Sequence, residues 1–162
     1  MALYTVAGQR WFIGPAIAFK QTPFVASEFT GITSGSWSEI TGIVSVGKWG
    51  DTAKSISVEF LDSRREISIP TTFGSTPSEF NLGRNPSDPG QAAILAASLN
   101  PSVFYAMRMY FNDAPLSGTP TTAYFIARWS PASFDGGNAQ SHDTWTPQLL
   151  ISSNIVIVPR SA

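Results

Sequence analysis

A single helical segment stands out in a chain whose other apolar stretches are patterned as strands. Asp88 precedes Pro89, and this pair is typical of a helix start, because the carboxylate accepts a backbone N–H and proline lacks one. Alanine and leucine dominate the residues that follow, and Asn100-Pro101 ends the segment. A helix of this length is marginal alone in water. The sequence therefore predicts a mainly β fold, an antiparallel β-sandwich or barrel with a single flanking α-helix at about 88–100.

The large apolar residues of this helix form a narrow stripe. Ile94, Leu95 and Leu99 make up the stripe, and we expect these three side chains to pack against the sheet. Small residues occupy much of the remaining surface and allow close approach of strands or of a second subunit; they are Ala92, Ala93, Ala96 and Ala97.

Strand patterns lie on both sides of the helix. Residues 54–61 alternate apolar and polar side chains, and Ile67 and Ile69 resume this alternation after a cluster of charges, which predicts a hairpin that stops at Pro70. The other predicted strands are a broken strand at 11–19, bent at Gly14-Pro15, and strands at 37–46, 79–82, 103–111, 123–129, 149–151 and 155–158, with 21–36 as an extended arm or loop and 71–78 and 130–141 as loops.

Composition narrows the class of protein. The 162 residues predict one domain, 1–162, and the charged share of 13% is about half that of an ordinary soluble domain, as expected for a β-rich protein that uses its surface in assembly. The net charge of −1 argues against specific nucleic-acid binding. The chain has no cysteine, so it has no disulfide and no thiolate site. The apolar run at 11–19 is too short to span a membrane, and we expect a soluble, unexported protein.

Residues that could carry catalysis are few and form no recognised pattern. The one histidine, His142, lies between Ser141 and Asp143, but no nucleophile motif accompanies it. Asp51 with Glu59 could be imagined as a glycosidase pair, as could any two of the eleven acids. We therefore expect no enzyme activity, no metal site and no cofactor.

The tip of the predicted hairpin carries both signs of charge. Asp62, Arg64, Arg65 and Glu66 could pair with a complementary surface, such as a second copy of the chain, or could form a solvated turn. Trp49, in the turn before the hairpin, could anchor a subunit contact or pack in the core.

A set of short segments, taken in order, carries a family resemblance. The segments are WSEITGI at 37–43, GKWGD at 47–51, ISVEFLDS at 56–63, ISIP at 67–70, SEF at 78–80 and DPGQ at 88–91. Together they resemble the tail tube (major tail) protein of long non-contractile-tailed bacteriophages, over about residues 8–158.

This resemblance implies a structural virion protein that assembles into stacked, hexameric rings around a channel for DNA, with strands of each subunit joined in an inner barrel. It implies assembly in the host cytoplasm, DNA only in transit, no membrane, and as partners other copies of the chain and the tape measure, tail terminator and distal tail proteins. The region 47–76 would reach the next ring, with an interface that includes Trp49, Asp51, Asp62, Arg64, Arg65 and Glu66. Glu39 and Glu59 are candidates for lining the lumen.

Other classes of protein share parts of this pattern. One alternative is another ring-forming component, such as a tail terminator or an Hcp-like secretion tube protein. A more distant alternative is a carbohydrate-binding β-sandwich, because the chain has five tryptophans. A tail tube protein and the other ring-forming components should form rings or stacked tubes, whereas a carbohydrate-binding β-sandwich should be a monomer.

Overall fold

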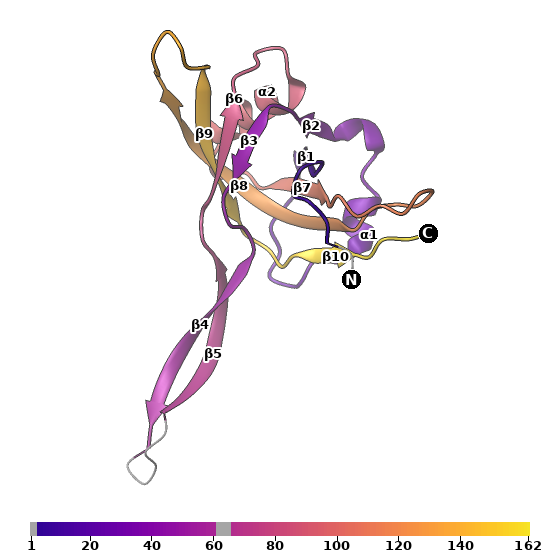
Figure 1. The fold of residues 1–162 in the computed structure, drawn as a ribbon. Helices are drawn as coiled ribbons and strands as arrows, with labels where there is room; N and C mark the ends of the chain where they lie inside the picture. The colour runs from indigo at the N-terminus through magenta and orange to yellow at the C-terminus, as the bar shows by residue number, and fades with distance from the viewer. Residues whose placement is uncertain (1–2, 61–65) are drawn as a thin grey trace.

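Antiparallel strands dominate the computed structural model, which describes residues 3–60 and 66–162 (Figure 1). The predicted mainly β class is confirmed. One eight-stranded sheet forms the body of the molecule. Its strands are β1 (Arg10–Ala16), β2 (Ser38–Ile40), β3 (Ile43–Val46), β6 (Ser78–Gly83), β7 (Tyr105–Tyr110), β8 (Thr122–Asp135), β9 (Thr144–Ile151) and β10 (Val156–Val158).

The sheet curls back on itself. Its strand order is β2-β1-β7-β8-β9-β6-β3, with β10 beside β8, so β2 and β3 lie at the two ends of the order. Only Thr41 and Gly42 separate these two strands in the chain, and the ends of the sheet must therefore approach each other. Gly42 makes this corner with a φ of 74°, a conformation that glycine adopts readily. The prediction of one continuous strand at 37–46 is wrong for this reason.

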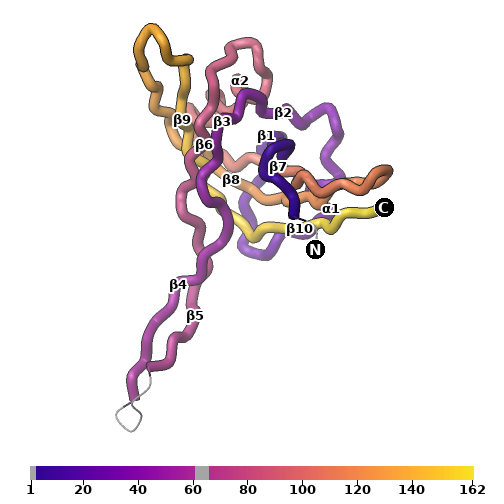
Figure 2. The backbone as a smooth tube through the Cα atoms, in the orientation of Figure 1, coloured from indigo at the N-terminus to yellow at the C-terminus, as the bar shows by residue number. Residues whose placement is uncertain are grey.

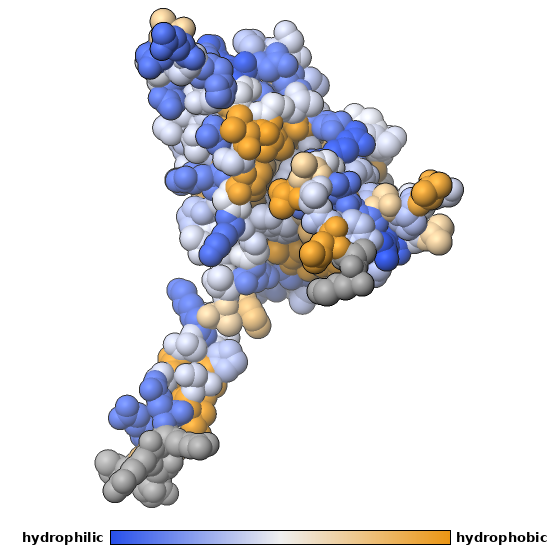
Figure 3. Space-filling model, viewed as in Figure 1, coloured by the Kyte–Doolittle hydropathy of each residue, from blue (hydrophilic) through white to orange (hydrophobic). Residues whose placement is uncertain are grey.

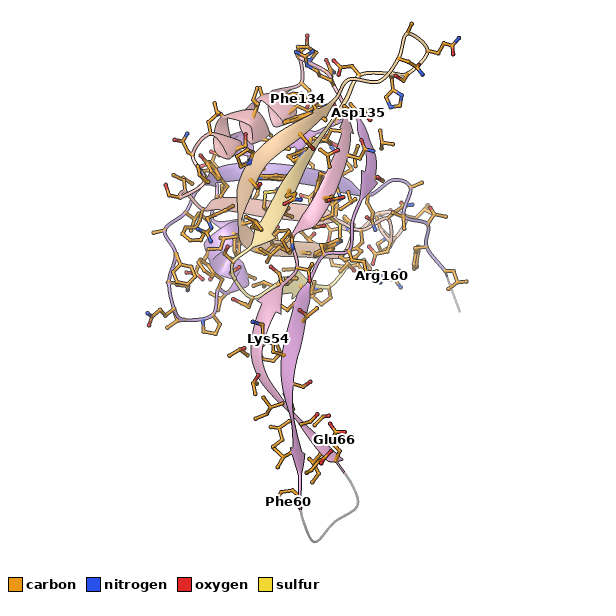
Figure 4. All side chains as sticks on the ribbon, turned by 90° about the vertical axis from the view of Figure 1, so that its left-hand side faces the viewer. Lys54, Phe60, Glu66, Phe134, Asp135 and Arg160 are labelled. Carbon is orange, nitrogen blue, oxygen red and sulfur yellow. The ribbon has the colours of Figure 1, made fainter. Side chains whose placement is uncertain are left out.

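β8 runs through both halves of the curled sheet. Residues 122–127 pair with β7, whereas residues 127–135 pair with β9. The half of the sheet that contains β9 crosses the half that contains β7 (Figure 4). We call β3, β6, β9 and residues 128–135 of β8 the four-strand layer. The predicted loop at 130–141 is wrong in its first part, because β8 continues to Asp135 through a register shift between Ser130 and Ser133.

Aromatic side chains fill the space between the two halves. The ring of Trp11 on β1 lies 5.0 Å from that of Phe80 on β6, which in turn lies 5.3 Å from Trp129 on β8. Trp49 completes the contact with its ring 5.2 Å from Trp11 and 5.8 Å from Phe125. Edge-to-face and offset arrangements of this kind add to the gain from burial.

A short helix covers the reverse face of β7 and β8. Helix α1 (Ala26–Thr30) and a 3-10 turn (Ser34–Ser36) lie in the segment predicted as an extended arm or loop, so that prediction is wrong in its local structure. Phe29 is buried and stacks on Tyr124 at 5.4 Å. As predicted, this segment lies against a surface.

The predicted central helix is confirmed as α2 (Pro89–Ser98), which packs on β8, β2 and β1. The Asp88 carboxylate accepts the Gln91 backbone N–H at 2.8 Å, as the sequence predicted. Ile94 is fully buried. The prediction is wrong for Leu95 and Leu99, which are 45% and 75% exposed, because the helix turns small and polar residues to the sheet instead. The buried residues of α2 are Gly90, Gln91, Ile94, Ala97 and Ser98.

A two-stranded hairpin projects from the body, and we call it the arm. It consists of β4 (Asp51–Glu59) and β5 (Glu66–Ser75), which continue from β3 and lead into β6 (Figure 2). The predicted stop at Pro70 and the loop at 71–78 are wrong, because β5 runs through Pro70 to Ser75. A two-stranded ladder has two open edges, and there a proline without an N–H is tolerated.

Candidate assembly surfaces

The four-strand layer has one apolar and one polar face. On the face toward the core, Phe134, Trp145, Leu82 and Ile43 form one row of cross-strand partners. On the opposite face, Ser130, Gln148 and Glu79 form another such row. Residues directly opposite each other in an antiparallel pair point to the same side. The polar row shows that this layer is built to have one side in contact with water.

The polar face of this layer is nearly free of charge. Asn81 and Thr146 add an amide and a hydroxyl beside the row of Ser130, Gln148 and Glu79. The cation on β8, Arg128, lies with its guanidinium 5.0 Å from the ring centroid of Phe104. Arg128 pairs with Leu150 and is on the same side as Ser130 and Gln148. This face therefore carries hydroxyls, amides, one carboxylate and one cation.

The four-strand layer has two open edges. Within residues 3–60 and 66–162, β3 pairs only with β6, and residues 128–135 of β8 pair only with β9. All neighbours in the layer are antiparallel, so its two edge strands also run in opposite directions. Open strand edges are templates for pairing with another chain.

A groove with a volume of 1190 Å³ runs beside β3, between this strand and the segment before β1. Val6, Val44 and Val46 are among its lining residues. Trp49 also lines it, and its partly buried indole packs against the core. The subunit contact predicted for Trp49 stays a prediction. Asp51 stands at the rim of the groove at the base of the arm, where partial desolvation raises the pKa of the carboxyl group.

The arm has an apolar face without a covering element. Ile56 pairs with Ile69, and Val58 with Ile67, so these four side chains share one side of the hairpin. Ile56 and Ile67 are 53% and 50% exposed. Apolar atoms accordingly run along the arm in the space-filling view (Figure 3). An exposed apolar surface of this kind is typical of an interaction site.

Three of the four residues of the charged tip predicted from the sequence, Asp62, Arg64 and Arg65, lie outside the described residues. Glu66 begins β5 and is exposed, with Glu59 as its cross-strand partner at the far end of the arm (Figure 4). The interface role predicted for these residues stays a prediction.

The two acids predicted to line the lumen lie on different parts of the molecule. Glu39 is on β2, where its carboxylate accepts two hydrogen bonds from Arg10 at 2.7 and 2.6 Å. These hydrogen bonds lower the pKa of Glu39. Glu59 is on the arm, and neither residue belongs to the polar face of the four-strand layer.

The residues first weighed for catalysis have other partners. The Asp143 carboxylate accepts a hydrogen bond from Arg84 at 2.9 Å, and the Ser141 hydroxyl donates to the Asn138 carbonyl. Among the described residues, no three His, Asp or Glu side chains are grouped so that they could hold a metal ion. In residues 3–60 and 66–162 we find no helix that is both long and apolar enough to cross a membrane.

Comparison with known proteins gives matches in structure only. No family model matches the sequence, and no curated protein matches it. A chain of the cryo-EM structure of the anti-feeding prophage baseplate matches with a TM-score of 0.67 and 11% identity, covering 98% of both chains.

Two further solved structures match over most of their length. A chain of the PVC sheath-tube complex, from an extracellular contractile injection system, matches with a TM-score of 0.65 and 13% identity over 97% of this chain and 92% of that one. The SPP1 tail tube matches with a TM-score of 0.65 and 11% identity, over 96% and 80%. The resemblance inferred from the sequence is thus confirmed at the level of the fold, without preference for a non-contractile tail. The chain has the fold found in the SPP1 tail tube and in components of contractile injection systems.

Proposed function

We propose that this chain is a structural tube protein that assembles with itself into stacked rings, in a phage tail or a related injection system. The observation that carries this proposal is the four-strand layer, with its open antiparallel edges and one polar face. The shared fold with the SPP1 tail tube and with chains of contractile injection systems supports it.

The open edges supply a way to close a ring. When copies are related by rotation about an axis along the strands, β3 of one copy meets residues 128–135 of β8 in the next. The two strands run antiparallel, as they do within one copy. A head-to-tail contact that closes makes a ring, and the closed barrel has no free edges. We propose six copies, in keeping with the six-fold symmetry of the matched baseplate.

In this ring the polar face of the four-strand layer lines the lumen, because the apolar face is buried in each copy. The proposal places Glu79, Gln148 and Ser130 on the channel wall, in place of Glu39 and Glu59. The wall carries hydroxyls, amides, the carboxylate of Glu79 and one cation, Arg128, whose guanidinium lies over the Phe104 ring. It has no excess of cations, so DNA passes without being held.

The arm supplies the contact between rings. It projects along the strands of the four-strand layer, beyond the end of the body opposite to Phe134 and Asp135 (Figure 4). Translation along that direction repeats the ring and places each arm on a copy of the next ring. At the two ends of the tube, where no further ring follows, we expect other tail proteins to bind.

Electron microscopy of the purified protein tests the proposed function. We expect rings and stacked tubes at high concentration by negative stain, and a large species by size-exclusion chromatography. A protein that stays at its monomer mass of 17.4 kDa at every concentration contradicts the proposal and favours a monomeric binding module. Single rings that never stack favour a tail terminator.

A further inference from the structure

An uncharged apolar stripe lies on the outside of α2. Ala92, Leu95, Ala96 and Leu99 are all exposed, and their spacing of three and four residues places them on one side of the helix. Pro89–Ser98 contains no charged residue. A surface helix ordinarily carries its charges on this side, so the stripe is an unpartnered face.

The arm and α2 lie at opposite ends of the body. β6 begins beside the arm at Ser78, and its other end, Gly83, leads into α2 (Figure 1). Stacking of identical copies by translation brings opposite ends together. The end that carries the arm in one copy therefore meets the end that carries α2 in the next.

The two surfaces agree in chemistry and in length. From Ile56 to Phe60 the apolar face of the arm spans roughly 13 Å at a strand rise of about 3.3 Å per residue. From Ala92 to Leu99 the stripe spans roughly 10 Å at about 1.5 Å per residue. A two-stranded hairpin is marginal in water and is stabilised by further strands or by packing against a helix. The stripe on α2 is such a helix.

From these observations we propose that the apolar face of the arm docks on the Ala92, Leu95, Ala96 and Leu99 stripe of a second copy in the adjacent ring. This inference rests on the proposed function and names the receiving surface. The groove beside β3 is the competing receiver. It is rimmed by Lys48, Asp51 and Glu79, and it adjoins the strand edge that closes the ring, so the uncharged stripe fits the arm better.

Cysteine cross-linking tests the contact, because the chain has no cysteine of its own. The Ile67→Cys and Leu99→Cys variants are mixed, assembled and oxidised, and a disulfide needs the two Cα atoms within about 7 Å. We expect a cross-linked dimer on denaturing gels from this mixture. The matched control replaces Ser68, the exposed neighbour of Ile67 on the other side of the arm, and Ser68→Cys with Leu99→Cys should give no cross-link.

Two results overturn the inference. One is a cross-link between Ile67→Cys and Val44→Cys, in the groove, with none to Leu99→Cys. The other is unchanged maleimide labelling of Leu99→Cys after assembly, because it would show that the stripe is still exposed in the tube. We expect assembly to abolish the labelling. Failure of the unmodified chain to form tubes contradicts the proposed function, whereas tubes without the cross-link contradict this inference alone.

Discussion

At the residue scale, the Gln91 side chain joins several elements. Its amide N–H groups donate to the carbonyls of Thr41 and Gly83 at 2.9 and 2.8 Å. Its carbonyl oxygen accepts from the Asn85 backbone and from the Trp145 indole at 3.0 and 3.2 Å. The side chain thereby fixes the β2–β3 corner, the end of β6 and the start of β9 to the helix. The sequence places Gln91 in the DPGQ segment, but no local signal indicates that its partners come from the β2–β3 corner, β6 and β9.

Replacement of Gln91 by leucine should therefore destabilise the fold. Gln91→Leu keeps the volume but leaves buried donors and acceptors without partners, and we expect a loss of about 3 kcal/mol in the free energy of unfolding. Urea denaturation measures it. The control Gln140→Leu, at an exposed position in the β8–β9 turn, should change the free energy by less than about 0.5 kcal/mol. Equal effects of the two substitutions would contradict the role of Gln91.

The Arg10–Glu39 ion pair gives stability a small dependence on pH. Hydrogen bonds from Arg10 lower the pKa of Glu39 below its ordinary value of 4.5, so the ionised carboxylate favours the folded state. The contribution is present above pH 4.5 and is lost as the pH falls through the lowered pKa. Both side chains are partly exposed, which limits the pair to about 0.5 kcal/mol.

The Glu39→Gln variant tests this contribution. At pH 7 the variant should unfold at a slightly lower urea concentration than the unsubstituted protein, and the difference should shrink as the pH is lowered below 4.5. A difference that is independent of pH would show that the ionised pair is not its cause.

At the scale of elements, the hairpin of the arm was predicted, but its second strand is longer than predicted and runs to Ser75. The alternation of Ile56 and Val58 with serines predicted the hairpin, because a period-two pattern is local. The register, in which Ile56 pairs with Ile69 and Val58 with Ile67, comes from the structure. The break at Gly42 and the extension of β8 to Asp135 depend on the curl of the whole sheet, which no local pattern carries. Likewise α1 is only five residues long, and Phe29 holds it in place by tertiary packing on Tyr124.

Hydrogen exchange should separate the arm from the body. In the unassembled protein we expect the amides of β4 and β5 to exchange much faster than those of β7 and of residues 122–127 of β8, because the arm has one layer and these residues of β8 are buried on both faces. On assembly, protection of the arm should rise. An arm that is as protected as β8 in the monomer would contradict its need for a partner.

A lysine on the open edge of β3 should stop ring closure. Val44 is 56% exposed on β3, so Val44→Lys leaves the core intact but places a charge where the neighbouring strand must pair. We expect a folded monomer with unchanged circular dichroism and no rings. Val25→Lys is the matched control, since Val25 is 53% exposed at the start of α1, and this variant should assemble normally. Rings formed equally by both variants would contradict the edge pairing.

At the scale of the whole molecule, the arm and the four-strand layer define one direction. In the proposed ring, lateral pairing of the layer joins neighbouring copies. The arm extends along the same strands, beyond one end of the body (Figure 1). The sequence predicted this class of assembly from an ordered set of short segments. The sequence did not indicate which strand edges would pair in a ring or which face would line its lumen. The row that contains Glu79 and the open edge of β8 exist only once the sheet has folded.

A cryo-EM reconstruction of assembled tubes would show the proposed strand pairing itself. We predict that β3 of each subunit pairs antiparallel with residues 128–135 of its neighbour in the tube wall, with Glu79 and Gln148 facing the lumen. A tube in which these two edges stay unpaired, or in which this face points away from the channel, would contradict the proposed ring.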